Sequence, residues 1–168
     1  AGQCVRLFGA FQDITDRKIA EEEIRKSQEH FKVISENVAD MIAVLDLDGK
    51  RLYNSPSYRQ ILGDVELLQG TDSFEDIHPN DRENIRQIFL NTKKTGTGHR
   101  AEYRLISRNN KTHYIESQGS VVRDEAGEIT SIIVVSRDVT EKRKLEQQFL
   151  RMQRMESIGA LAGGIAHD

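Results

Sequence analysis

The chain has one cysteine, Cys4, no long uninterrupted apolar run and no excess of charge of one sign. A single thiol excludes both a disulfide framework within one chain and a cysteine-rich metal site. The longest apolar run, residues 158–166, contains glycines and is less than half of the roughly 20 residues that a membrane span requires. Because no signal peptide opens the sequence, we expect a cytoplasmic location, with any membrane anchor of a longer parent protein outside this segment.

Charged residues make up 30% of the 168 positions, but the formal net charge is only −3. This balance leaves no basic surface for nucleic acid, so we expect no nucleic-acid partner. The sequence also has no Gly-x-x-x-x-Gly-Lys-Ser/Thr loop or comparable phosphate cradle, so the chain by itself has no ATP site. His99 and His113 stand apart from cysteine or carboxylate ligands at metal-binding spacing, and we expect no metal.

The N-terminal region is expected to hold a strand and then a charged helix. Residues 5–12 alternate in polarity as a strand does, and Thr15 fits the N-cap of the helix that follows. Apolar positions of that helix, spaced alternately by four and three, form a heptad seam: Ala20, Ile24, Ser27, Phe31, Ile34 and Val38. We interpret the seam as a short parallel coiled coil formed by dimerisation, with a solvated single helix as the alternative.

The entry to this helix has a second copy. Asp13-Ile14-Thr15 returns as Asp138-Val139-Thr140, 125 positions further on, again ahead of a charged helix. Such a recurrence indicates a tandem array with one complete repeat between the copies. The domains predicted are the last strand of a truncated upstream repeat (1–15), a linker or signalling helix (16–36), one complete domain (31–140) and a second coiled-coil helix (141–168).

The complete domain has the pattern of an α+β layer. Ser55-Pro56-Ser57 is expected to cap a short helix and Gly96 to end a longer one. Turn residues between neighbouring strands make those strands antiparallel. We therefore expect a five-stranded antiparallel sheet with helices packed on one face. The predicted elements are strands at 41–47, 50–53, 101–107, 112–122 and 128–136, with the longer helix at 81–95.

The C-terminal helix continues the domain with a second seam at heptad spacing: Leu145, Gln148, Met152, Met155, Gly159, Ala162 and Ala166. From Met155 a further apolar stripe widens the buried arc, as at the start of a four-helix bundle in a dimer. His167 falls on the opposite face, where Gly163 and Gly164 leave its imidazole bare. Two glycines inside a helix cost about 1–2 kcal/mol, which close approach of another protein surface would offset. A frayed helix end is the alternative.

Residues 155–168 read Met-Glu-x-Ile-Gly-x-Leu-Ala-Gly-Gly-Ile-Ala-His-Asp and closely resemble the H-box of sensor histidine kinases, the dimerisation and phosphoacceptor helix. The resemblance implies that His167 is the phosphorylated histidine. It also implies that Asp168 orients the imidazole or takes its proton. A neutral imidazole is a nucleophile near pH 7, in keeping with attack on the γ-phosphoryl group of ATP.

Residues 31–140 resemble a PAS domain through three landmarks in order: Asn54-Ser55-Pro56-Ser57-Tyr58, Ile77-His78-Pro79-Asn80-Asp81, and the turn at 124–127 followed by Asp138-Val139-Thr140. In that family, the Asp and Thr that end the last strand couple the sheet to the output helix. The resemblance therefore implies a signal-transfer role for Asp138 and Thr140.

PAS domains hold flavin, haem, small metabolites or no ligand. The cysteine of the flavin-thiol subclass and the helix histidine of haem-binding members have no counterpart in the domain, since Cys4 lies outside it and residues 81–95 contain no histidine. We therefore expect neither cofactor. A pocket between sheet and helices is predicted to be lined by Tyr58, Ile88, Tyr103, Leu105, Ile115, Ser117 and Val134, unless these residues are simply core.

Together the two resemblances predict the sensory region of a two-component sensor histidine kinase. The parent would autophosphorylate His167 with ATP and Mg²⁺ held by a separate domain, then transfer the phosphoryl group to an aspartate of a response-regulator receiver domain. The expected partners are a second copy of the chain, those two domains and a small-molecule ligand. The alternative is a non-enzymatic PAS module for ligand binding or dimerisation in another signalling protein.

Overall fold

The computed structural model describes residues 13–167, without the side chains of 16, 36, 37 and 157–167. The chain divides after Asn37 into two compact units. The strand expected at 5–12 lies outside the described residues.

The described part of the first unit is helix α1 (Thr15–Asn37) with the two residues before it. The side chain that binds a free backbone N–H at the start of α1 is that of Asp13, not that of Thr15. The Asp13 carboxylate accepts a 2.9 Å hydrogen bond from the Thr15 backbone N–H. Ile24, Phe31 and Ile34 of the predicted seam are exposed along the single helix. Val38, the last position of that seam, lies beyond the end of α1.

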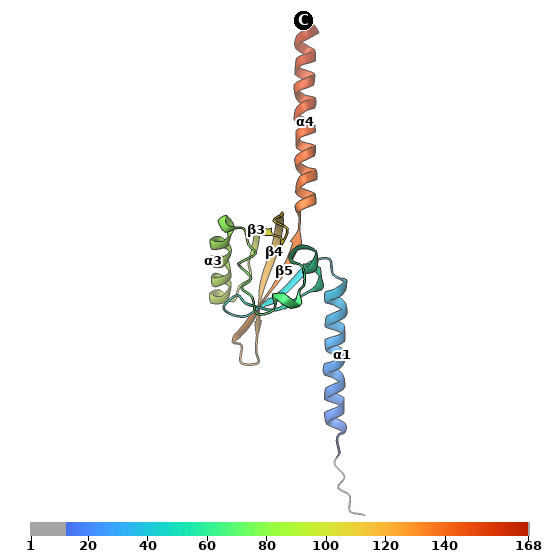
Figure 1. Cartoon of the computed structure of the whole chain (residues 1–168), viewed down its shortest axis with the longest axis vertical. Coiled ribbons are helices and arrows are strands. Elements are labelled where there is room, and N and C mark those ends of the chain that lie inside the picture. Colours follow the sequence, from blue (N-terminus) through green and yellow to red (C-terminus); the bar gives the residue numbers. More distant parts are fainter. Residues whose placement is uncertain (1–12, 168) are drawn as a thin grey trace, which may run out of the picture. The chain divides into compact units, whose positions relative to one another are not determined.

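The second unit contains the five-stranded antiparallel sheet, which confirms the predicted α+β fold class (Figure 1). Its order is β2-β1-β5-β4-β3, so the first and last strands in sequence, β1 and β5, are paired at the centre of the sheet. Each predicted strand is present to within two residues at either end. The bounds are β1 Met41–Leu45, β2 Arg51–Asn54, β3 Arg100–Ile106, β4 Thr112–Arg123 and β5 Ile129–Asp138.

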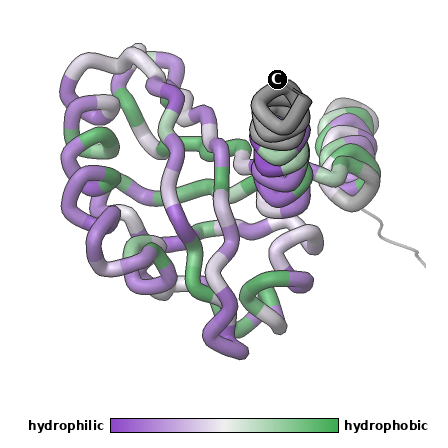
Figure 2. Tube along the Cα trace, turned by 90° about the horizontal axis from the view of Figure 1, so that it is seen from above, coloured by the Kyte–Doolittle hydropathy of each residue, from purple (hydrophilic) through white to green (hydrophobic). Residues whose placement is uncertain are grey.

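Four helical segments lie between β2 and β3: η1 Pro56–Tyr58, α2 Arg59–Leu62, η2 Glu66–Leu68 and α3 Pro79–Thr95. His78 caps α3 by accepting a hydrogen bond from the Asn80 N–H at Nδ1, and Gly96 ends it in the left-handed conformation that glycine adopts freely. Figure 2 shows hydrophobic and hydrophilic residues interspersed along the chain, as expected where elements pack one face on a core.

The core packs α3 and the short helices against one face of the sheet. Met41, Ala43 and Leu45 alternate inward along β1, and Phe74 meets Phe89 of α3 edge to face with centroids 5.4 Å apart. Burying side chains of this size contributes about 1.5–3 kcal/mol each. The core therefore holds the sheet and helices together and positions the residues between them.

Ser55 is the N-cap residue of η1, followed by a proline, as predicted, but its side chain makes no capping hydrogen bond. Its hydroxyl accepts a 2.9 Å hydrogen bond from the Ile42 N–H of β1, and its own N–H donates to the Ile42 carbonyl. Ser57 donates to the carbonyl of Val38. The Ser-Pro-Ser turn thus fastens the helical segment to the sheet, because both serines reach β1 or the residues just before it.

Residues 70–78 connect the two outer strands of the sheet. At the start of this segment, the Arg51 N–H donates to the Thr71 carbonyl and Gly70 donates back to Arg51. At its end, Ile106 of β3 donates to Asp76, and His78 donates to Arg104. These bonds occupy backbone groups that an open edge strand would present to other chains.

Candidate functional site

A cavity of about 80 Å³ lies between the inner face of the sheet and α3. Ile85, Ile88 and Phe89 of α3 form one wall, and Ile132 and Val134 of β5 belong to the opposite wall. Of the seven residues predicted for a pocket, six line it: Tyr58, Ile88, Tyr103, Leu105, Ser117 and Val134. Ile115 does not line the cavity and is packed in the core, with 1% of its surface exposed.

Sequence reasoning missed several lining residues, among them Arg51, Thr92, His99 and Gly119. Arg51 and His99 carry polar groups that ordinarily face water, so the alternation of polarity alone predicts that they lie on the solvent side and not in the cavity. A glycine inside a strand does signal a close approach or a space. Gly119 fits that signal, since a Cβ built on it meets only the His99 carbonyl, at 3.8 Å.

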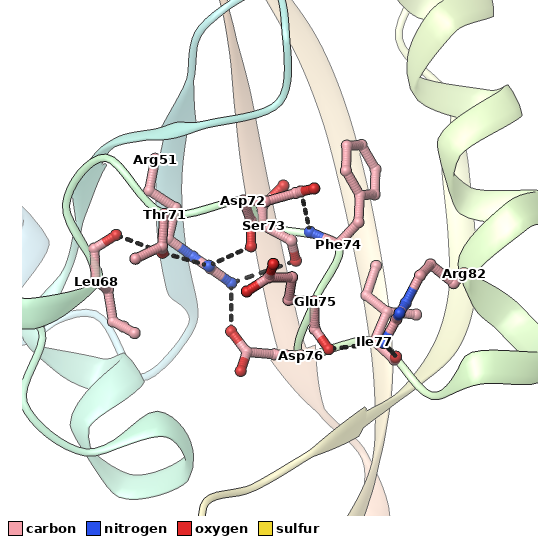
Figure 3. A network of polar contacts seen from close by, with 10 residues as sticks. All are labelled: Arg51, Leu68, Thr71, Asp72, Ser73, Phe74, Glu75, Asp76, Ile77 and Arg82. Atoms are coloured by element: carbon pink, nitrogen blue, oxygen red, sulfur yellow. Dashed lines mark hydrogen bonds and ion pairs between the residues drawn. The ribbon is translucent and has the colours of Figure 1, made fainter.

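Arg51 is buried, with 4% of its side chain exposed, and its guanidinium binds the loop that crosses the sheet (Figure 3). One terminal nitrogen donates to the Thr71 hydroxyl and the Asp72 carbonyl, both at 3.0 Å. The other donates to the Asp76 carboxylate at 2.9 Å and the Ser73 carbonyl at 3.3 Å. A buried charge is tolerated when it is paired and hydrogen-bonded in this way.

Hydroxyl groups cluster at one side of the cavity. Burial raises the pKa of Tyr58 and, also with desolvation as its main cause, that of Tyr103. Ser136 is only 1% exposed, pairs in register with Ser117 and lies beside both phenols, where its hydroxyl partly offsets the rise of their pKa values. Ser136 itself is not among the residues that line the cavity.

His99 contributes a second polar group to the cavity wall. Its Nδ1 lies 3.3 Å from the hydroxyl of Thr92, which is buried on α3, and its Nε2 lies 3.5 Å from the side-chain amide of Asn91. Which ring nitrogen donates depends on the tautomer. These contacts hold the imidazole against α3, so His99 joins the helix to the residues that lead into β3.

The end of β5 and the start of helix α4 (Thr140–His167) are bound to β4. The Val139 N–H donates to the Tyr114 carbonyl at 2.8 Å, and the Tyr114 N–H donates to the Thr140 hydroxyl at 2.9 Å. Val139 and Thr140 are both buried. The first turn of α4 is therefore fixed to the sheet through backbone groups of a single residue.

Asp138 links the same junction to His113. One carboxylate oxygen accepts a 2.8 Å hydrogen bond from the Thr140 N–H, and the other lies 2.7 Å from His113 Nδ1. Partial burial alone would raise the pKa of Asp138, but the bonds from Thr140 and the contact with His113 outweigh it and lower the pKa. The same bond to the second following residue occurs at Asp13 and Thr15, so both copies of the repeated signature have one local geometry.

Arg143 makes a further connection between α4 and the sheet. Its guanidinium pairs with Glu102 of β3 and lies over the Tyr114 ring, 5.0 Å from the centroid. Next to it, Arg104 of β3 forms a bidentate pair with Asp81 in the first turn of α3, which lowers the pKa of that carboxyl. Asp81, Arg104, Tyr114 and Arg143 line one hollow, so α3 and α4 meet the same stretch of β3 and β4.

Helix α4 runs to His167, which places the predicted phosphoacceptor on the last described helical residue. Its side chain, and all of Asp168, lie outside what the structure describes. Leu145, Met152 and Met155 of the predicted seam are exposed, and Phe149 and Leu150 beside them are exposed as well. Within the described residues, no helix is long and apolar enough to cross a membrane, and no three His, Cys, Asp or Glu side chains gather in a metal-binding group.

The family model for the PAS fold matches residues 51–136. The chain belongs to the PAS family. Solved PAS domains share its architecture. One from an HTR-like protein of Haloarcula marismortui has a TM-score of 0.61 at 24% identity, covering 72% of this chain and 98% of that one. A sensory box histidine kinase/response regulator from Burkholderia thailandensis has a TM-score of 0.55 at 25% identity, with 75% and 95% covered.

Relatives of this PAS chain include sensor kinases. Sporulation kinase A of Bacillus subtilis is 27% identical over 166 residues, which cover 93% of this chain and 26% of the kinase. Sensor kinase CckA of Brucella abortus is 29% identical over 133 residues, covering 76% of the chain and 14% of that protein. The chain therefore spans about a quarter or less of these relatives, and its PAS domain is similar to those of sensor histidine kinases.

Proposed function

We propose that this chain is the sensory PAS segment of a sensor histidine kinase and that it relays a signal through α4 to the phosphoacceptor His167. The observation that carries the proposal is the junction at Tyr114, which binds the sheet to the first turn of a helix that continues to His167. The similarity to sensor kinases extends over most of the chain, including residues on both sides of that junction.

The relay begins at the cavity, whose walls include α3. A change in packing there moves α3 against β3, and the Asp81–Arg104 pair transmits the movement to the strand that also holds Arg143 through Glu102. Asp138 and Thr140 transfer it to the backbone of α4. Packed helix pairs have discrete arrangements, so a small displacement at the junction is converted into a different packing of the two copies of α4 in a dimer.

The phosphotransfer chemistry at the end of α4 is inferred from the residue types. The neutral imidazole of His167 attacks the γ-phosphoryl group of ATP in line, with ADP as the leaving group, while the Asp168 carboxylate holds the proton of the second ring nitrogen. A separate ATP-binding domain supplies the nucleotide and Mg²⁺. The phosphoryl group then passes to an aspartate of a receiver domain, in a cytoplasmic, dimeric assembly.

The test is phosphorylation in trans. This chain, extended through the second helix of the bundle, is mixed with a separately expressed ATP-binding domain of a histidine kinase, ATP and Mg²⁺, and acid-labile phosphate on the chain is measured. We expect label on the unaltered chain and none on His167→Gln, whereas His30→Gln, a substitution on exposed α1, is labelled normally. Equal labelling of His167→Gln, or no label on the extended chain, contradicts the proposal.

A further inference from the structure

We propose that His113 positions the start of α4 through Asp138, and that the protonation state of its imidazole sets how firmly Asp138 holds the Thr140 N–H. His113 is then a positioning residue that makes the junction between the sheet and α4 respond to pH. The inference deepens the relay proposed above by naming a way in which the junction is regulated. It rests on that relay only for its biological meaning, because the local effect belongs to the folded domain itself.

The start of α4 depends on a side chain from outside the helix. The Val139 carbonyl accepts a helical bond from the Arg143 N–H at 2.9 Å, so Val139 occupies the N-cap position. Valine has no side-chain oxygen, and the N–H groups of a first turn have no partner within their helix. The Asp138 carboxylate supplies the acceptor for the Thr140 N–H, at 2.8 Å. A residue that holds this carboxylate in place therefore helps to fix the first residue of α4.

His113 holds the second oxygen of that carboxylate. The oxygen lies 2.7 Å from Nδ1, and because an ionised carboxylate only accepts hydrogen bonds, Nδ1 must carry the hydrogen. Burial alone would raise the pKa of Asp138, but its bonds from Thr140 and His113 lower it, so the carboxylate is ionised near neutral pH. No described residue bonds to Nε2 of His113, and 22% of this side chain is exposed. Nε2 is therefore the atom that takes up and releases a proton.

Protonation changes the strength of this contact without changing its partners. A histidine side chain changes its charge between about pH 5 and pH 8. When the imidazole is protonated, the bond from Nδ1 to the carboxylate is charge-assisted and about twice as strong as the bond from the neutral ring. As the pH rises through this range, the bond weakens, and Asp138 is held less firmly at the start of α4.

The elements around His113 offer the imidazole no second anion to pair with among the described residues. The β3 residue opposite His113 is Leu105, which is apolar and buried. The ionisable residues of the adjoining elements are Tyr103 in β3, Arg108 and Lys111 in the turn before β4, and Glu141, Lys142 and Arg143 in α4. Burial raises the pKa of Tyr103, which stays neutral, and Glu141 and Arg143 already form ion pairs elsewhere. Arginine and lysine keep their charge in this range, so they add no titration of their own.

The test follows the Thr140 amide by NMR while the pH is raised from about 5 to about 8. We expect its resonance to move in one step that coincides with the titration of the His113 ring. Its protection from hydrogen exchange, relative to that of Ile132 in the core, should fall about fivefold across the step. His113→Gln keeps a side-chain donor but cannot titrate, and it should abolish both effects while the domain stays folded. His30→Gln, the same substitution on exposed α1, should leave both effects unchanged.

Asp138→Ala separates the positioning from the titration. In this variant the His113 ring still titrates, but the Thr140 amide should no longer follow it. The proposal is overturned if the Thr140 step persists in His113→Gln or in Asp138→Ala, or if the unaltered chain shows no step. These measurements need neither ATP nor a kinase domain, so failure of the phosphotransfer proposal leaves their result interpretable.

The regulatory consequence is measured on the extended chain by labelling in trans at about pH 6 and about pH 8. The ratio of label on the unaltered chain to label on His113→Gln should differ severalfold between the two conditions, because the titration of His167 affects both chains alike. A ratio that does not change with pH contradicts regulation by His113. Absence of label on both chains contradicts the phosphotransfer proposal, and the NMR titration then decides the role of His113 alone.

Discussion

The Tyr114 backbone and the Thr140 side chain are joined by a 2.9 Å hydrogen bond, in which the strand N–H donates to the hydroxyl that opens α4. Thr140 is 9% exposed, so this bond is largely shielded from water. The Thr140 side chain therefore accepts a hydrogen bond from strand β4, and Thr140 is also the first residue of α4.

Thr140→Val removes that acceptor and leaves the Tyr114 N–H unsatisfied. We expect the free energy of unfolding to fall by about 1–3 kcal/mol, and the exchange of the Tyr114 amide hydrogen to become faster. Thr140→Ser, which keeps the hydroxyl, should retain most of the protection. Denaturant titration and amide exchange measure both effects, and equal exchange in the Val and Ser variants would contradict the assignment.

The low pKa of Asp138 predicts a pH dependence of stability. Because the pKa is lower in the folded chain than the value of about 3.9 expected for an unfolded one, the stabilising effect is complete above that value and is lost as the pH falls through the folded pKa. Asp138→Asn removes this titration. Thermal unfolding between neutral and acidic pH should show the variant less stable near neutrality, with the gap closing below about pH 4.

Breaking the Arg51 network should be severely destabilising. Arg51→Met leaves the Asp76 carboxylate and the loop oxygens without their donor, and removal of one partner of a buried pair costs about 3–5 kcal/mol. Because 30% of the Asp76 side chain is exposed, Asp76→Asn should cost less. Denaturant unfolding of the two variants checks the order. A smaller loss for Arg51→Met than for Asp76→Asn would show that the guanidinium is dispensable.

Two neighbouring glycines, Gly98 just before β3 and Gly119 in β4, should differ sharply in their tolerance of a side chain. A Cβ on Gly98 would lie 1.9 Å from the Gly119 carbonyl oxygen, which is backbone and cannot move aside, whereas a Cβ on Gly119 meets its nearest atom at 3.8 Å. We expect Gly98→Ala to lower the stability by about 1–3 kcal/mol or more, as overpacking does, and Gly119→Ala to be nearly neutral. Thermal unfolding of the pair tests this difference.

The exposed seam of α4 predicts dimerisation. Met152→Lys places a charge at a core position of the expected coiled coil and should shift the chain toward monomer. Gln147→Lys adds the same charge to the same helix outside the seam, and should leave the association unchanged. Light scattering over a concentration series distinguishes the outcomes. If the unaltered chain is monomeric at all concentrations, the prediction that the seam of α4 forms a dimer is wrong.

Much of the fold could be predicted from the sequence because the signals are local. Alternation of polarity and turn residues identified all five strands, and Gly96 was correctly predicted to end α3, since left-handed geometry at a helix end favours glycine. The landmarks around Ser55, His78 and Asp138 identified the PAS family. Six pocket residues were predicted because they lie on the inner faces of those strands and helices.

The remaining features depend on partners far away in sequence, which no local pattern specifies. Ser55 occupies the predicted helix cap, but the sequence did not show that its hydroxyl binds Ile42, since only the fold brings β1 beside it. Arg51 was not recognised because a buried arginine depends on the loop from Thr71 to Asp76 closing over it. The sequence by itself determined the elements and the family, whereas the tertiary structure decided the pairing of β1 with β5, the burial of Ser136 beside two phenols and the size of the cavity, because each arises from packing between segments.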